Sequence, residues 1–308
     1  LSRYMSVLGK VKTILNALVR RGYWYDNVFL PDARKFQVYS TFNTKVVNLG
    51  STSAVAAFDY SGLPVKAANW ALRRNPLAGD WAVLRNYASY LDAKDSTVII
   101  PLCPFSALSG DYEPFEDRYY SVLYPSTIPG YSYVHNVHAQ EKITNPVMHY
   151  PWYGIFVDLW HLCFKGNAKS MREEDMAKDA ENRISGWLKE FAMEGFNTPL
   201  SLWNKDNISS ALEHVQNLIV FCRERNITAV LTVPPVYKTL SDKFSSEAKE
   251  LLFGGFERIA KENDVTFINY MTDPQFVNER TMFRDSYLMN KNGARTFTKR
   301  ILTDLKLI

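Results

Sequence analysis

The chain has 308 residues, of which 46% are hydrophobic and 22% charged, values typical of a folded globular protein with a sizeable core. Its net charge of +4 comes from Lys and Arg spread along the chain, so the charge predicts a solvated surface and argues against nucleic-acid binding. No uninterrupted run of about 18 apolar residues occurs, so no transmembrane segment is expected in this chain.

The first expected element is an amphipathic helix within residues 1–22. Apolar side chains recur there at helical spacing, namely Met5, Leu8, Val11, Leu15 and Leu18. Gly22 is a suitable residue to end the helix. We expect this helix to dock on its own domain, and the alternative is that it binds a membrane surface or a partner.

From residue 45 onward, short apolar runs alternate with helical patterns. The runs expected as strands are Lys45–Leu49, Val65–Asn69, Thr97–Leu102, Thr228–Val233 and Thr266–Tyr270. The third lies within STVIIPLCPF, a nearly continuous apolar stretch of the kind buried on both faces of a parallel sheet. The alternation therefore predicts an α/β protein with a parallel sheet of about five strands and helices on both faces.

Residues 106–206 interrupt this alternation for far longer than an ordinary connection. The segment is dense in aromatic residues, and we interpret it as an insertion within one domain that spans residues 1–308. We expect the insertion to lie over the carboxyl edge of the sheet. Its aromatic side chains are expected to form a small core of their own, with a sugar-stacking wall as the alternative.

Open parallel sheets bind ligands beyond the carboxyl ends of their strands. The residues that follow the expected strands are therefore candidates for ligand binding, namely Gly50, Ser53, Asn69, Ser106, Tyr237 and Tyr287. Hydroxyl groups directly after the first strand also suit helix N-caps, because an N-cap side chain accepts a hydrogen bond from a free helical N–H. A binding role and a capping role both remain open for these hydroxyls.

Two short motifs at this edge carry a family resemblance. NLGSTS, residues 48–53, and DSYLMNKNGARTFT, residues 285–298, resemble the first and last blocks of the SGNH (GDSL-like) hydrolases. These esterases and acyltransferases have a flavodoxin-like, three-layer α/β/α fold, which the resemblance implies here for residues 45–301 apart from the insertion. The chain is also similar to SGNH-like proteins of gut bacteria, some of them encoded near polysaccharide genes.

The resemblance implies site residues, and several of them depart from the family pattern. Thr52 stands at the nucleophile position, where its extra methyl group crowds attack, and Ser51 is the neighbouring alternative. Asp285 matches the orienting carboxylate, but Leu288 stands where the family has its general-base His. The family's second-block Gly and third-block Asn are also missing, so the resemblance implies an incomplete oxyanion hole.

Two functional hypotheses follow. The first is a degenerate hydrolase that binds a carbohydrate, an acylated small molecule or a partner without turning it over. The second is an O-acyl esterase or acyltransferase that acts on a glycan, with Thr52 or Ser51 as nucleophile and a relocated His as base. The candidate bases lie in the insertion and are His135, His138, His149 and His161.

Cofactors and location are constrained only by the cysteines and the N-terminal residues. Cys103, Cys163 and Cys222 lie far apart in apolar runs, which predicts buried thiols and no metal-ligand spacing, and we expect no cofactor. These thiols and the lack of a signal peptide favour the cytoplasm. An extracytoplasmic protein with an anchor upstream of Leu1 is the alternative, and the oligomeric state is left open.

Overall fold

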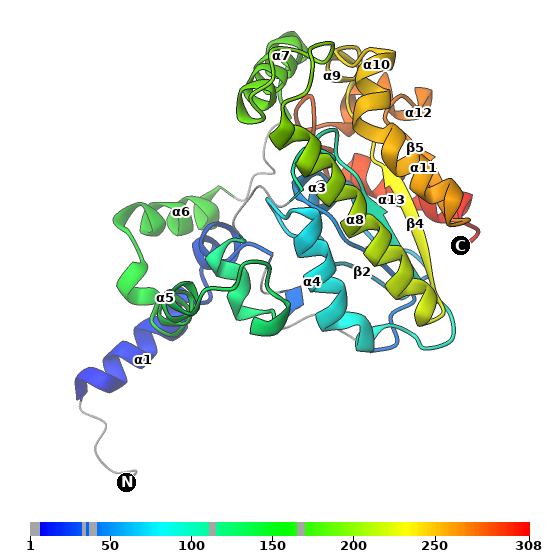
Figure 1. Ribbon diagram of the computed structural model, residues 1–308. Helices are drawn as coiled ribbons and strands as arrows, with labels where there is room; N and C mark the ends of the chain where they lie inside the picture. Colours follow the sequence, from blue (N-terminus) through cyan, green and yellow to red (C-terminus); the bar gives the residue numbers. More distant parts are fainter. Residues whose placement is uncertain (1–6, 33–34, 37–41, 111–114, 165–169) are drawn as a thin grey trace. The chain divides into compact units, whose positions relative to one another are not determined.

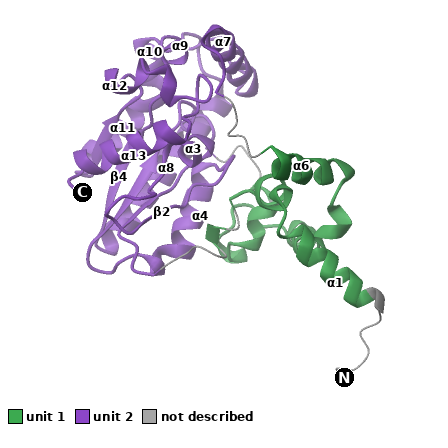
Figure 2. Ribbon diagram, turned by 180° about the vertical axis from the view of Figure 1, so that it is seen from behind, with its two compact units in different colours: residues 1–40, 115–168 green, residues 41–114, 169–308 purple. Residues whose placement is uncertain are grey.

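The computed structural model describes residues 7–32, 35–36, 42–110, 115–164 and 170–308. The chain divides into two compact units (Figure 2). Unit 1 comprises Leu1–Ser40 and Phe115–Ala168, and unit 2 comprises Thr41–Pro114 and Lys169–Ile308. The range 106–206, which the sequence analysis treats as one insertion, is therefore shared between the units. Residues 115–168 belong with the N-terminal segment, whereas residues 106–114 and 169–206 belong with the sheet.

Unit 2 contains a five-stranded parallel sheet, which confirms the predicted fold class. Its strands are β1 (Val46–Asn48), β2 (Ala67–Asn69), β3 (Ser96–Pro101), β4 (Ile227–Val233) and β5 (Thr266–Asn269). The order in the sheet is β2-β1-β3-β4-β5, the order of flavodoxin-like doubly wound folds. β3 lies near the middle and is buried along its whole length, as its continuous apolar run predicts.

Helices cover both faces of this sheet (Figure 1). One layer contains α4 (Leu77–Tyr87), α8 (Leu202–Glu224) and α11 (Gly255–Glu262), and the other contains α3 (Thr52–Ala57) and α13 (Lys291–Asp304). The remaining α-helices of unit 2 are α7 (Glu173–Glu190), α9 (Lys238–Ser241), α10 (Ser246–Lys249) and α12 (Pro274–Val277). A core that includes Phe276, Phe297 and Ile301 fills the space beneath α3 and α13.

Local sequence explains where the two longest sheet-covering helices begin. Ser201 caps α8 by accepting a hydrogen bond from the Asn204 N–H, and Asn290 caps α13 by accepting one from the Gly293 N–H. Gly293 also allows close packing, because a Cβ atom at this position would collide with the Met282 carbonyl oxygen. The start of α13 is thereby held against the loop that precedes it.

Unit 1 is a small helical unit. Within its described residues, the α-helices include α1 (Val7–Val19), α5 (Tyr133–Thr144) and α6 (Trp152–Cys163). Short 3-10 helices lie at Asp117–Ser121, Pro125–Thr127 and Pro146–His149, and a π-helical turn lies at Tyr25–Phe29. The core of unit 1 contains Val19, Trp24, Tyr25 and Leu30. None of the described helices is long and apolar enough to cross a membrane.

The N-terminal helix differs from its expected docking. The stripe residues Val11, Leu15 and Leu18 are exposed, so the prediction that this stripe packs on its own domain is wrong for these three positions. Residues 1–6, including Met5, lie outside the described part of the chain, and α1 as described begins at Val7. The prediction of buried thiols is confirmed for Cys222 and wrong for Cys163, which is exposed, while Cys103 is half-buried.

Candidate functional site

Unit 2 has a pocket of about 340 Å³ beyond the carboxyl ends of β1 and β3. Its wall combines residues from several separate segments. The segments on the β1 side contribute Ser51 and Thr52 after β1, Arg74 and Asn75 from the β2–α4 loop, and Asp80 from α4. The exit of β3 contributes Cys103, Phe105 and Ser106. The end of α7 and the loop before α13 contribute Trp187, Glu190, Phe191 and Tyr287. Ligand sites of doubly wound sheets occur at this edge.

The β1–α3 turn holds both candidate nucleophiles. Gly50 adopts φ +110°, a conformation that L side chains rarely adopt, so the turn requires glycine. The Ser51 hydroxyl accepts a hydrogen bond from the Asn75 N–H at 3.2 Å, and the Thr52 hydroxyl accepts one from the Arg74 N–H at 3.1 Å. Ser51 occupies the N-cap position of α3, but its side chain makes no capping hydrogen bond. Both hydroxyls therefore hold the β2–α4 loop against the turn.

Asp80 is a pocket residue that the sequence analysis missed. It lies in the first turn of α4, and only 2% of its surface is exposed. Its Oδ1 accepts hydrogen bonds from the Gly50 N–H at 2.8 Å and from the Asn75 amide at 2.6 Å. Burial raises the pKa of Asp80 to about 7, although the two hydrogen bonds favour the charged form. The sequence does contain one indication of this residue, because Asp80 is the single charged residue within the largely apolar stretch PLAGDWAVL.

Three of the predicted ligand-binding residues surround Cys103. The Ser106 hydroxyl accepts a hydrogen bond from the Cys103 N–H at 2.9 Å and lies 3.2 Å from its sulfur. Burial raises the pKa of the Tyr287 hydroxyl, Cys103 raises it further, and a hydrogen bond with Ser53 lowers it. The structure therefore brings Ser53, Ser106 and Tyr287 together beside the pocket, at the exit of β3.

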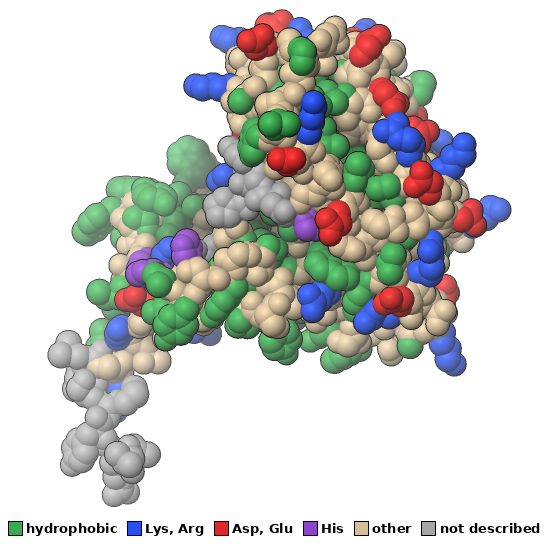
Figure 3. Space-filling model, in the orientation of Figure 1, with side chains coloured by type: hydrophobic (Ala, Val, Ile, Leu, Met, Phe, Trp, Pro, Cys, Tyr) green, Lys and Arg blue, Asp and Glu red, His purple; other side chains and the backbone are tan. Residues whose placement is uncertain are grey.

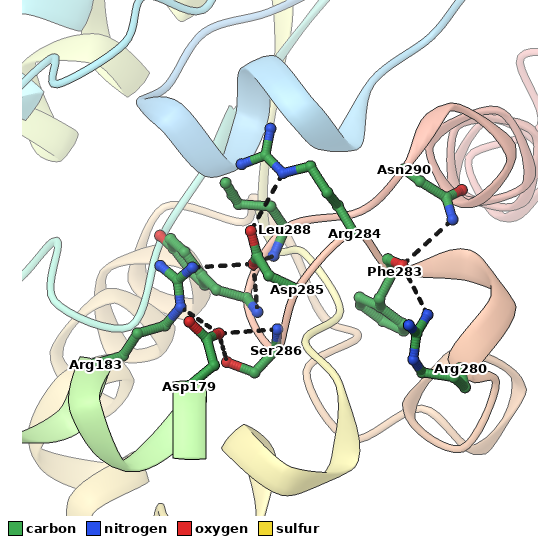
Figure 4. A network of polar contacts seen from close by, with 10 residues as sticks. Asp179, Arg183, Arg280, Phe283, Arg284, Asp285, Ser286, Leu288 and Asn290 are labelled. Carbon is green, nitrogen blue, oxygen red and sulfur yellow. Dashed lines mark hydrogen bonds and ion pairs between the residues drawn. The ribbon is translucent and has the colours of Figure 1, made fainter. Parts of the chain in front are cut away.

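Asp285 and Leu288 do not line this pocket. The Asp285 Oδ1 accepts hydrogen bonds from the N–H groups of Tyr287 and Leu288 at 3.0 and 2.8 Å. It also pairs with Arg183 of α7 at 3.1 Å (Figure 4). Leu288 is buried, and its carbonyl oxygen accepts a hydrogen bond from the Arg284 N–H. The contacts of the Asp285 carboxylate thus hold the loop together.

Arg183 joins this carboxylate to a second one. Its Nε donates to the Asp179 carboxylate at 2.8 Å, and that carboxylate accepts hydrogen bonds from the N–H and the hydroxyl of Ser286 (Figure 4). Burial would raise the pKa of Asp179, but the hydrogen bonds and charge of Arg183 and the hydrogen bonds of Ser286 lower it overall. The Asp179–Arg183–Asp285 network ties α7 to the loop that carries Tyr287.

Two other predicted ligand-binding residues lie outside the pocket wall. The Asn69 amide nitrogen lies within hydrogen-bonding distance of three carbonyl oxygens at the end of α3, and its oxygen accepts hydrogen bonds from Asn48 and Ala71. Tyr237 is buried in the core, where its hydroxyl donates to Glu173 at 2.8 Å. The contacts of both side chains are those of structural residues.

No histidine is among the residues that line the pocket in the described chain. His135, His138, His149 and His161 belong to unit 1, and His214 lies on α8, 3.4 Å from the Ser210 hydroxyl. Within the described residues, no group of three or more His, Cys, Asp or Glu side chains is arranged to hold a metal ion.

Comparisons with known proteins reveal distant structural likeness. No protein-family model matches the chain, and no curated protein matches it. A "putative acylhydrolase" from Bacteroides fragilis is 9% identical, with a TM-score of 0.43 over 91% of this chain and 96% of its own. A "putative platelet activating factor" from Streptococcus pneumoniae is 11% identical, with a TM-score of 0.41 over 96% and 92%. These values assign no activity to the chain.

Proposed function

We propose that unit 2 binds a carbohydrate or an acylated small molecule in the pocket at the carboxyl edge of its sheet, without turning it over. The observation that carries this proposal is the buried Leu288, at the position where the SGNH resemblance requires a general base. Leucine cannot accept a proton, and a hydroxyl group is a weak nucleophile without an adjacent base. The carboxylate of Asp285 is already engaged by two backbone N–H groups and two arginines.

The chemistry of the pocket wall suits a sugar. Sugar rings combine apolar faces with hydroxyl edges, and pockets that bind such ligands pair aromatic walls with a few polar groups. Phe105 lies 4.6 Å from the Trp187 ring and 5.5 Å from the Phe191 ring, which gives one side of the pocket an aromatic surface. Ser51, Thr52 and Asn75 supply polar atoms elsewhere in the wall.

The side-chain oxygen of Asn75 is a hydrogen-bond acceptor that a ligand could satisfy. Its Oδ1 is buried and accepts no hydrogen bond from the described part of the chain. A buried carbonyl oxygen without a donor destabilises the folded state, so a ligand hydroxyl gains binding energy when it displaces the atoms that cover this oxygen and donates to it. The amide nitrogen of the same side chain is held by Asp80 at 2.6 Å, which fixes the orientation of the oxygen.

Binding is tested with an array of plain and O-acetylated oligosaccharides, followed by calorimetry on any sugar retained. We expect Trp187→Ala to weaken binding about tenfold, because loss of an aromatic contact costs roughly 1–1.5 kcal/mol. The matched control is Trp81→Ala, since Trp81 is also half-buried in unit 2 but packs against Phe221 outside the pocket. Equal losses in the two variants, or retention of no sugar, would contradict the proposal.

Asp80 favours a second candidate, an O-acyl esterase or acyltransferase in which this carboxyl replaces the histidine as base. A carboxyl with a pKa of about 7 is partly ionised at neutral pH and suited to proton transfer. Asn75 links it to the candidate nucleophile, because its amide donates to Asp80 while its backbone N–H donates to Ser51. The leading proposal remains binding, because no described contact joins Asp80 directly to either hydroxyl.

An ester-hydrolysis assay separates the two candidates. We expect the protein to hydrolyse p-nitrophenyl acetate no faster than the uncatalysed background, since loss of the base in a hydroxyl-based triad lowers kcat by about 10⁶-fold. Thr52→Ala, Ser51→Ala and Asp80→Asn should then leave the measured rate unchanged. Turnover above background that Ser51→Ala or Thr52→Ala abolishes would establish the esterase instead, and loss on Asp80→Asn would identify its base.

A further inference from the structure

Helix α6 of unit 1 exposes its apolar side chains. Trp152, Tyr153, Phe156, Leu159 and Trp160 follow the spacing i, i+1, i+4, i+7 and i+8, so they share one helical face. The exposed fractions of Trp152, Phe156 and Trp160 are 82, 69 and 66%. A helix of a water-soluble domain ordinarily turns such a face toward its core. The exposed stripe of α6 is therefore a feature that needs a partner.

The opposite face of α6 is fixed against the core of unit 1, and this sets the direction of the stripe. The Asp158 carboxylate accepts hydrogen bonds from the Trp24 N–H at 2.7 Å and from the Tyr150 hydroxyl at 2.5 Å. At Gly154, a Cβ atom would collide with the Tyr150 ring. His161 stacks on Tyr23 at 3.9 Å. The polar and small residues of α6 thus face inward.

Helix α1 shows the same arrangement. Val11, Ile14, Leu15 and Leu18 form an exposed stripe with the spacing i, i+3, i+4 and i+7. The side of α1 that packs inward includes Asn16, whose Oδ1 accepts a hydrogen bond from the Val147 N–H at 2.9 Å. The helical spacing places Lys10 and Lys12 on the flanks of the stripe, and both are exposed. Arg21 is also exposed and lies in the turn just after the helix.

The excess positive charge of the protein is concentrated in unit 1. The sequence of unit 1 contains ten Lys or Arg residues and six Asp or Glu residues, whereas unit 2 contains 26 of each kind. In the space-filling view, hydrophobic side chains gather over the part of unit 1 that carries α6, with basic side chains on the same unit (Figure 3). Exposed apolar surface and positive charge therefore occur together.

We propose that unit 1 binds the surface of an anionic lipid bilayer through the exposed stripes of α6 and α1. Helices that lie in the membrane interface present Trp, Phe and Leu to the lipid and carry Lys and Arg beside them. Trp and Tyr are enriched at the level of the headgroups, where α6 offers Trp152, Tyr153 and Trp160. With 12 residues, α6 is too short to span a bilayer, so it lies in the interface.

The test is co-sedimentation of the full chain with vesicles of phosphatidylcholine that either contain or lack phosphatidylglycerol. We expect binding to the anionic vesicles and its weakening by salt. The variant Phe156→Ser/Trp160→Ser should bind at least about tenfold less, because it removes two large apolar side chains from the lipid. The control is Leu202→Ser, which replaces an apolar residue of unit 2 that is even more exposed than Phe156 and Trp160.

The variant Lys10→Glu/Lys12→Glu tests the charge contribution separately. These side chains are exposed and leave the packing of α1 intact, so the variant should fold. It should lose at least about fivefold in affinity at each position, because each substitution removes a positive charge and adds a negative one. Thermal melts of every variant check folding. Failure of the parent chain to bind either kind of vesicle would overturn the proposal. So would a stable dimer, seen by light scattering, that the Phe156→Ser/Trp160→Ser variant dissociates.

Discussion

Replacement of Arg183 by Met is expected to destabilise the protein by about 3 kcal/mol, because it leaves two largely buried carboxylates without their shared cation. Arg183 pairs with Asp179 at 2.8 Å and with Asp285 at 3.1 Å. Methionine keeps much of the apolar stem and removes the charge. The free energy of unfolding in urea measures the effect at neutral pH.

The matched control is Arg258→Met, which breaks the surface pair between Arg258 and Glu250. That pair is solvated on both sides, so we expect a loss of no more than about 0.5 kcal/mol. A loss at Arg183 as small as the loss at Arg258 would show that the Asp179–Arg183–Asp285 network does not hold the loop.

The same network sets a pH dependence of stability. The pKa of Asp179 is lowered, since the hydrogen bonds and charge of Arg183 and the hydrogen bonds of Ser286 outweigh the opposing effect of burial. A carboxyl whose pKa is lowered on folding stabilises the fold above its unfolded pKa, and this stabilisation is lost as the pH falls through the folded pKa. Arg183→Met should therefore shift the onset of acid unfolding to higher pH.

Replacement of Asp80 by Asn is expected to change the stability of the protein toward neutral pH, whereas the Arg183 variant changes it at acid pH. Burial raises the pKa of Asp80 to about 7 from its usual value of 3.8, so the folded state holds this proton more tightly than the unfolded state. Stability should then fall as the pH rises from about 4 to 7, by about 4 kcal/mol in the limit of full titration. The asparagine side chain stays neutral and its oxygen can accept from the Gly50 N–H, so the variant should lose this dependence and exceed the parent in stability above pH 7.

Unfolding curves across this pH range measure the difference. The control is Asp95→Asn, because Asp95 is an exposed carboxylate beside Lys45 and should leave the profile of the parent unchanged. Identical profiles for the parent chain and the Asp80→Asn variant would show that the pKa of Asp80 is the same in the folded and unfolded states, and the second functional candidate would lose the raised pKa on which it rests.

The sequence by itself determined the class of fold, because strand and helix patterns repeat over a few neighbouring residues. The apolar run of the third strand predicted Thr97–Leu102, and β3 spans Ser96–Pro101. The alternation of strands with helices required parallel crossovers, and the parallel sheet follows from them. The pocket residues Ser51, Thr52 and Ser106 could also be named, since ligands of such sheets bind where the strands end.

The tertiary structure alone decided which side chains meet. Asp80 accepts a hydrogen bond from the Gly50 N–H, 30 positions away in the sequence, and Asp179 accepts one from Ser286, 107 positions away. The hydrophobic patterns that predict helices and strands extend over only a few neighbouring residues, so they cannot predict such contacts. The same holds for unit 1, where residues 115–168 join the N-terminal segment through contacts such as Asp158 with Trp24. Burial also depends on the tertiary structure. The pKa of the Asp80 carboxyl is raised because the fold removes this group from water, and the residues next to it in the sequence do not predict that burial.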